Sequence, residues 1–284
     1  MPSIISAIIN ISKFRNNDLK QYSSRYLNRV NASGELFEYY IKDSIVGVFE
    51  KQEKDKEVEY DKIFSYTGNQ NNPPDLIIKN SDAFEIKKIE NKNSSIALNS
   101  SYPKNKLYIS DTRITTFCKN CEKERWEEKD FFYIIGCVKN KVIKNIFIIQ
   151  GECYCADPEI YKRLYEPLKD EIELILTTGG FEKGETNELG KVRRVDPLGI
   201  TDLRIRGMWH IQNPFKVFES IIKYDLKKEF SLYTIMTEDK YNLISKDERI
   251  VLEKNKEIII IDSKIKNPNN PAKLMDIKLI SFSF

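Results

Sequence analysis

The chain has a single histidine, His210, among its 284 residues. Hydrolytic mechanisms with a histidine base or several histidine metal ligands therefore cannot be assembled. No run reaches the roughly 18 apolar residues of a membrane span, and the N-terminus lacks a signal-peptide pattern. No phosphate-binding or dinucleotide-binding glycine motif occurs. These absences predict a cytoplasmic protein that uses no nucleotide cofactor.

The chain also has little net charge, because 46 Lys and Arg residues nearly balance 43 Asp and Glu residues to give +3. A uniformly basic coat for nucleic acid is thus excluded, and any DNA affinity must come from a local patch. With 40% hydrophobic residues, the chain can bury a core as one large domain.

Cysteine is scarce, with five residues in all. Two close pairs, Cys118 with Cys121 and Cys153 with Cys155, flank a predicted hairpin, and a folded-back hairpin would bring them together as a four-thiolate zinc site. Cys137 would stay outside that site. The favoured alternative is a set of reduced thiols, because the second pair lacks the usual two-residue spacer and disulfides are rare in the cytosol.

The most informative segment runs from Pro74-Asp75 to Glu85-Ile86-Lys87. Two short apolar runs flank the polar sequence of residues 79–82, which predicts a β-hairpin. Period-2 alternation places Glu85 and Lys87 on one face of the second strand, with Asp75 at the start of the first. The alternative is a surface hairpin with solvated charges.

Two carboxylates beside a lysine suit a divalent ion and a hydrolytic water. Mg²⁺ takes a few carboxylate oxygens and keeps water and substrate phosphate as its other ligands. We expect Asp75, Glu85 and the carbonyl of Ile86 to bind Mg²⁺, and Lys87 to position or activate the attacking water.

The motif resembles that of the PD-(D/E)xK nuclease superfamily, with Asp75, Glu85 and Lys87 in its three positions. Nucleases of this superfamily often carry a further glutamate on the helix before the hairpin. The spacing from Gly34 to Ile41 resembles that element, which implies that Glu38 is a second-metal or water-orienting carboxylate. The alternative is an ordinary exposed helix glutamate.

Two further segments carry groups suited to DNA. The polar loop of residues 94–104 offers hydroxyl, amide and ammonium groups for phosphates or base edges, and its predicted contacts are Asn99, Ser101 and Lys104. Later, Arg204 and Arg206 alternate with apolar residues, so both should leave the same face of a strand. Arginines bind guanine in a bidentate manner, and the candidates are Arg193, Arg194, Arg204 and Arg206, each of which could instead pair with an acid.

These segments together resemble the NgoPII-like family of type II restriction endonucleases. The likeness covers about three quarters of the chain, is specific in residues 99–104, 118–130 and 195–209, and is weakest after about Tyr224. The resemblance implies a restriction-endonuclease-like fold and Mg²⁺-dependent cutting of double-stranded DNA at GGCC. A palindromic target implies two-fold symmetry, hence a homodimer.

Local patterns predict an α/β or α+β fold with a central mixed β-sheet flanked by helices. We expect one domain over 1–284, with the catalytic core in 1–150 and DNA-recognition and C-terminal elements in 151–284. Predicted helices are Ser3–Phe14, Ser33–Phe49, Pro158–Leu176 and Pro214–Tyr224. Predicted strands are Leu76–Ile78, Ala83–Ile89, Asp130–Val138, Val142–Gln150, Thr201–Trp209 and Ile258–Ile261.

Two other functions remain open at this point. One is a repair or structure-specific nuclease of the same superfamily, which would act on damaged, branched or single-stranded DNA. The other is a DNA-binding module that keeps the hairpin as a scaffold without cutting. Discrete fragments from a digested plasmid would favour restriction over both.

Overall fold

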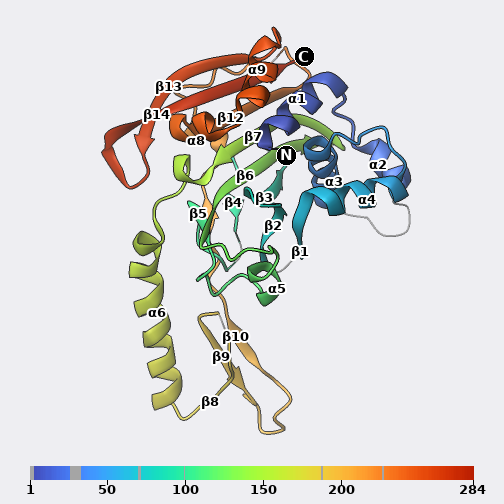
Figure 1. The fold of residues 1–284 in the computed structure, drawn as a ribbon. Coiled ribbons are helices and arrows are strands. Elements are labelled where there is room, and N and C mark those ends of the chain that lie inside the picture. Colours follow the sequence, from blue (N-terminus) through green and yellow to red (C-terminus); the bar gives the residue numbers. More distant parts are fainter. Residues whose placement is uncertain (1–2, 26–32, 70–71, 99, 187, 226) are drawn as a thin grey trace.

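A computed structural model describes residues 3–25, 33–69, 72–98, 100–186, 188–225 and 227–284. A mixed sheet of nine strands forms its centre, in the order β1-β2-β3-β6-β7-β12-β14-β13, with β5 paired to β6 (Figure 1). The pairs β3–β6 and β7–β12 are parallel and the other neighbours are antiparallel. The predicted fold class is therefore confirmed.

The strands of this sheet come from three separate parts of the chain, and their bounds are β1 Phe64–Asn69, β2 Asn72–Ile78, β3 Ala83–Ile89, β5 Lys106–Tyr108, β6 Glu128–Lys139, β7 Val142–Gln150, β12 Ser231–Thr237, β13 Ile259–Asn267 and β14 Asn270–Ser283. The two predicted hairpins, β2–β3 and β6–β7, are present. The C-terminal strands complete the same sheet that the N-terminal half begins.

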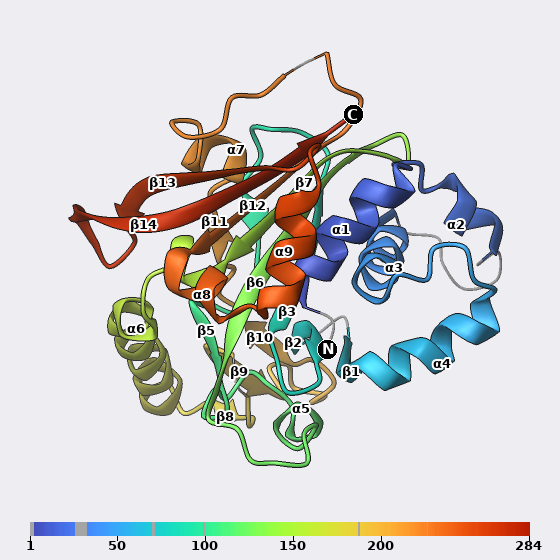
Figure 2. The same cartoon turned by 45° about the horizontal axis from the view of Figure 1, so that its top comes forward.

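Helices cover one face of this sheet, as Figure 2 shows for α1, α3 and α9. Among the described residues, the helices are α1 Ile4–Phe14, α2 Lys20–Arg25, α3 Ser33–Val46, α4 Glu53–Ile63, α5 Thr116–Lys119, α6 Pro158–Thr178, α7 Pro214–Val217, α8 Glu238–Leu243 and α9 Lys246–Lys254, with a 3₁₀ turn at Gly151–Cys153. None of them is both long and apolar enough to cross a membrane.

Helix α3 lies very close to the sheet. A Cβ atom on Gly136 of β6 would come within 2.3 Å of the Phe37 ring, so only glycine leaves room for this side chain. Phe37 is fully buried, with Phe84 and Ile86 of β3 in the same core cluster. A second buried cluster on the opposite face of the sheet contains Ala83 and Ile89. Because side chains alternate along β3, this strand contributes residues to both hydrophobic cores.

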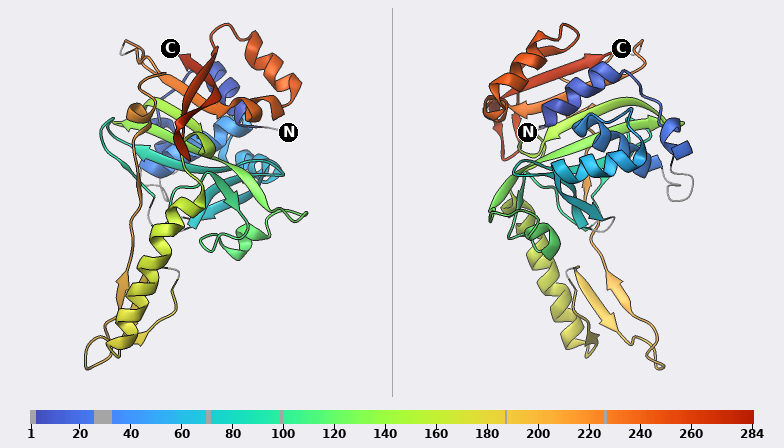
Figure 3. Two further views of the ribbon diagram at one scale, coloured as in Figure 1. Left: turned by 90° about the vertical axis from the view of Figure 1, so that its left-hand side faces the viewer. Right: turned by 45° about the vertical axis from the view of Figure 1, so that its right-hand side comes forward.

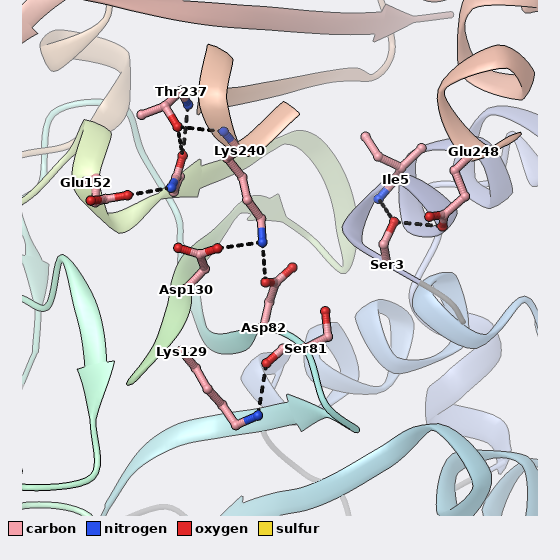
Figure 4. A network of polar contacts seen from close by, with 11 residues as sticks. Ser3, Ile5, Ser81, Asp82, Lys129, Asp130, Glu152, Thr237, Lys240 and Glu248 are labelled. Carbon is pink, nitrogen blue, oxygen red and sulfur yellow. Dashed lines mark hydrogen bonds and ion pairs between the residues drawn. The ribbon is translucent and has the colours of Figure 1, made fainter. Parts of the chain in front are cut away.

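A buried ion-pair network fixes the start of β3 (Figure 4). The Lys240 ammonium of α8 lies 2.5 Å from Asp82, in the β2–β3 turn, and 2.6 Å from Asp130 on β6. Lys129 donates a hydrogen bond to the Ser81 carbonyl at 3.2 Å. The turn before β3 is therefore held from β6 and from the C-terminal part of the chain.

An arm extends away from the central sheet (Figures 1 and 3). It consists of α6 and a small antiparallel sheet of three strands, which are β8 Glu182–Lys183, β9 Gly190–Arg193 and β10 Leu203–Ile205. Helix α6 packs on the arm strands through Ile172, whose side chain lies beside Gly190. Another two-stranded sheet joins β11 His210–Ile211 to β4 Ile96–Ala97, where the chain returns to the body.

Several predicted elements differ in extent from the observed ones. The helix predicted over Pro214–Tyr224 ends at Val217, after one turn capped by the Asn213 side chain. Of the strand predicted over Thr201–Trp209 only β10 forms, and β11 begins beyond it at His210, because the chain passes between them from the arm to the body. Strand β12 was missed, although all but one of its residues are buried.

Candidate active site

The three residues of the acidic motif gather at the edge of the β2–β3 hairpin. Asp75 lies on β2, and Glu85 and Lys87 project from one face of β3, as the alternation predicted. The backbone N–H of Ile86 donates a 2.6 Å hydrogen bond to Oδ2 of Asp75. The Lys87 ammonium lies 2.5 Å from Oε1 of Glu85. Two carboxylates and one ammonium therefore converge.

These charges perturb one another strongly. Burial, with a further contribution from the Glu85 charge, raises the pKa of Asp75 from 3.8 to about 8. The pKa of Lys87 is also raised: burial acts to lower it, but the charges of Glu85 and Asp75 outweigh that effect. Lys87 is therefore an ammonium at neutral pH, and the pair of buried carboxylates lacks a second positive charge.

The carboxylates fit a hard divalent cation. Oε2 of Glu85 is buried without a hydrogen-bond partner, which is costly for a carboxylate oxygen unless a cation binds there. No group of three His, Cys, Asp or Glu side chains in the described ranges could hold a metal, so the protein offers two carboxylates. Two protein carboxylates are enough for Mg²⁺, since water and substrate phosphate supply its remaining ligands.

A groove of about 730 Å³ joins this cluster to the arm. Its walls bring together residues of β2 and β3, the Ser100-Ser101 loop and residues of the arm. The charged side chains among them are Asp75, Glu85, Lys87, Arg113, Glu185, Glu188, Arg204 and Arg206. Four acids thus face four bases. With every group ionised these charges cancel, and a bound dication would make the groove positive and so favour a phosphate backbone.

Two of the four predicted arginines line this groove, on the arm side. Arg204 donates to both carboxylate oxygens of Glu188, at 2.8 and 3.1 Å, and Arg206 lies 2.7 Å from the same carboxylate. Both side chains remain more than half exposed. Glu188 therefore holds two guanidinium groups side by side, as the alternation with Leu203 and Ile205 predicted.

The other two predicted arginines lie elsewhere on the arm. Arg193 and Arg194 are exposed and do not line the groove, and Arg194 lies 3.7 Å from Glu182. A contact of either residue with DNA stays a prediction.

The predicted loop contacts have different outcomes. Ser101 lines the groove, and its hydroxyl is buried without a hydrogen-bond partner. Lys104 does not line the groove: it is only 4% exposed and forms a buried ion pair with Asp111, so a role in DNA binding is not supported. The ammonium is drawn inward because a buried carboxylate needs a counter-charge. Asn99 lies outside the described residues.

Glu38 lies near the cluster but does not join it. Its carboxylate forms an ion pair of 2.8 Å with Lys42 one turn along α3, and it does not line the groove. Its charge still adds to the rise in the pKa of Asp75. The implied metal or water contact of Glu38 therefore stays a prediction.

Arg113 is a groove residue that the sequence analysis missed. It follows a turn in which Oδ1 of Asp111 accepts a 2.8 Å hydrogen bond from the Arg113 backbone. Its guanidinium donates to the Tyr165 hydroxyl of α6 and lies 5.2 Å from that ring. It forms no ion pair with any acid of the described residues. A lone arginine in a polar loop gives no sequence signal, because only the fold brings it into one groove with Asp75.

The four cysteines proposed for zinc are not assembled into a site. Cys118 and Cys121 lie at α5, whereas Cys153 and Cys155 lie in the turn after β7, and together they form no metal-holding group. Burial raises the pKa of Cys118 and Cys155 to about 12. Hydrophobic packing on the face of the sheet opposite α1 and α3 accounts for these thiols.

Comparison with known proteins shows a full-length similarity. Residues 2–266 match the sequence model of a family described as NgoPII restriction endonuclease. The type II restriction enzyme NgoPII of Neisseria gonorrhoeae is 44% identical over 283 residues, which are 99% of each chain. No solved structure matches the chain. The matched length includes β2, β3, the arm and most of the C-terminal strands.

Proposed function

This chain belongs to the NgoPII restriction endonuclease family. From that premise we propose that it is a type II restriction endonuclease, which uses Mg²⁺ to cut double-stranded DNA at GGCC. Membership of the family carries site-specific cleavage of DNA and the use of a divalent metal ion. The observation that carries the assignment to this groove is the convergence of Asp75, Glu85 and Lys87 on its floor.

Asp75 and Glu85 would hold the cation through their carboxylates, and the Ile86 carbonyl is the third proposed ligand. The unpartnered Oε2 of Glu85 and the raised pKa of Asp75 support this role, because a dication would satisfy the first and displace the proton from the second. When bound, Mg²⁺ supplies the positive charge that stabilises the transferring phosphate oxygens and acidifies water.

Lys87 would orient the attacking water and stabilise negative charge. Because its pKa is raised, its ammonium keeps the proton at neutral pH and acts as a donor to the water or to a phosphate oxygen. Its 2.5 Å contact with Glu85 fixes the direction of the side chain. Glu38 would act as a second-metal or water-orienting carboxylate, and its charge already adds to the rise in the pKa of Asp75.

The opposite wall of the groove suits sequence recognition. Glu188 orients Arg204 and Arg206 toward the groove, and paired guanidinium groups suit the O6 and N7 acceptors of neighbouring guanines. Arg113 and Ser101 belong to loops of the body and not to the arm, and they suit phosphate contacts. The second half of the chain, residues 151–284, thereby supplies recognition as well as the last strands of the sheet.

The remaining properties follow from the reaction. A palindromic site is read by two copies related by a two-fold axis, so a homodimer is proposed. Hydrolysis needs no nucleotide cofactor, and a DNA substrate that is met inside the cell suits a cytoplasmic location.

The decisive experiment digests two plasmids of known sequence, one with GGCC sites and one without, in Mg²⁺ and in EDTA. Discrete fragments from the first plasmid alone, only with Mg²⁺, are expected. Smeared products from both plasmids would point to a repair or structure-specific nuclease. A gel shift without cutting would point to a binding module and would refute the proposal.

A further inference from the structure

The arm gathers most of the uncovered apolar surface of the molecule. Among the described residues, nineteen large hydrophobic side chains are exposed, and eleven of these lie in residues 160–208. Monomeric proteins rarely leave so many neighbouring apolar side chains in water without a partner. The concentration in one segment of the chain indicates a contact surface on the arm.

Helix α6 carries the most regular part of this surface. Tyr161, Tyr165, Ile172 and Leu176 face the body and the arm strands and are partly or fully buried. A second stripe on the neighbouring face stays in water: Ile160 is 43% exposed, Leu164 64%, Leu168 46% and Ile175 63%. Their spacing of four, four and seven residues places them on one side of the helix. The fold therefore covers only half of a wide apolar band.

Two charges beside the stripe indicate what covers it. Arg163 and Glu171 form no ion pair within the described residues, and both are exposed. Eight residues separate them, about 12 Å along the helix axis, so they cannot pair with each other within one helix. They lie at equal distances on either side of Pro167. An antiparallel second copy of α6 centred on Pro167 would bring each Arg163 against a Glu171.

We infer that α6 is the dimer interface of this protein, with the stripe of residues 160, 164, 168 and 175 packed against the same stripe of a second copy. The contact is isologous, so each apolar stripe covers the other and the ion pair between Arg163 and Glu171 forms twice. Glu171 next to the stripe disfavours DNA as the partner. The inference rests on the proposed homodimer and assigns the dimer contact to a surface. Because arm residues also line the catalytic groove, a dimer formed through the arm would bring two grooves into one assembly.

Sedimentation of the full chain, with and without a GGCC duplex, tests the interface. The parent protein should sediment at twice the chain mass of 33.3 kDa. Leu164→Glu should weaken self-association by at least about tenfold, because it places a charge at the centre of the contact. Leu243→Glu is the matched control, since Leu243 on α8 is 79% exposed and lies outside the arm.

Charge exchange makes the test specific for the antiparallel register. Arg163→Glu alone and Glu171→Arg alone should each weaken the dimer, and the double variant should restore it, because the pairs re-form with opposite polarity. A parent monomer in both conditions, a stable Leu164→Glu dimer, or a double variant no better than the singles would overturn the inference.

Plasmid digestion separates this result from the reaction. If the parent protein cuts GGCC but Leu164→Glu remains a dimer, the interface is wrong and the enzyme assignment stands. If Leu164→Glu is monomeric but the parent cuts nothing, the interface stands and the enzyme assignment fails.

Discussion

Replacing Asp75 by asparagine should make the metal-free protein more stable while it abolishes cleavage. The amide keeps an oxygen that can accept the hydrogen bond from the Ile86 N–H, so the local geometry is retained. It removes a negative charge that the folded groove holds at a cost. A metal ligand is lost in the same step, so activity and stability should change in opposite directions.

The magnitude follows from the pKa of Asp75, which rises from 3.8 to about 8 on folding. Between these values the folded protein keeps a proton that the unfolded chain releases, so this group makes stability fall as pH rises from about 4 to 8. At about 1.4 kcal/mol per pH unit, the cost is at most about 6 kcal/mol. The groove is open to water, so we expect a gain of about 3 kcal/mol for Asp75→Asn at pH 8 and about 1 kcal/mol at pH 5.

The assay is thermal unfolding in EDTA at both pH values. A gain of about 3 kcal/mol corresponds to a rise in Tm of about 6 °C for a chain of this size. Asp61→Asn, at an exposed aspartate near the end of α4, is the control and should change Tm by less than about 2 °C at either pH. A Tm at pH 8 no higher than that of the parent, or an equal gain at pH 5 and pH 8, would refute the reasoning.

Three further variants test other parts of the structure. Lys87→Met should slow plasmid cleavage about a thousandfold, while the Kd for a GGCC duplex in Ca²⁺ stays near that of the parent; cleavage near the parent rate would remove Lys87 from the site. Arg113→Met should lower the slope of log Kd against log salt by about 1, since one phosphate contact is lost; an unchanged slope would argue against that contact. Lys254→Met is the matched loss of charge, because no residue of α9 lines the groove. Lys240→Met leaves Asp82 and Asp130 without their counter-charge, so urea unfolding at pH 8 should show a loss of about 3 kcal/mol; a loss under 1 kcal/mol would show that Lys240 does not anchor β3.

The strands that carry the acidic motif were predictable because their signals are local. The alternation from Ala83 to Ile89 determines which side chains share a face, and the observed strand has the predicted bounds. The apolar runs of β6 and β7 and the periodicity of α6 were equally clear. Each of these elements is specified by residues within a few positions of one another.

The predictions failed where a contact joins distant parts of the chain. Residues 201–209 alternate as a strand does, yet they leave the arm and return to the body, so the strand is interrupted at Ile205. Lys104 looked like a free basic residue, but the fold buries it against Asp111. No local pattern reveals which acid a lysine will meet.

The sequence by itself determined the mixed α/β class, the hairpin with its two acids and one lysine, and the family. Only the tertiary structure decided that Arg113, from a loop before α5, shares a groove with Asp75 and with Arg206 of the arm, that Glu188 holds two arginines, and that half of the α6 apolar band stays uncovered. The physical reason is that strand alternation and helix periodicity act over a few residues, whereas burial and ion pairing depend on which surfaces the whole chain brings together.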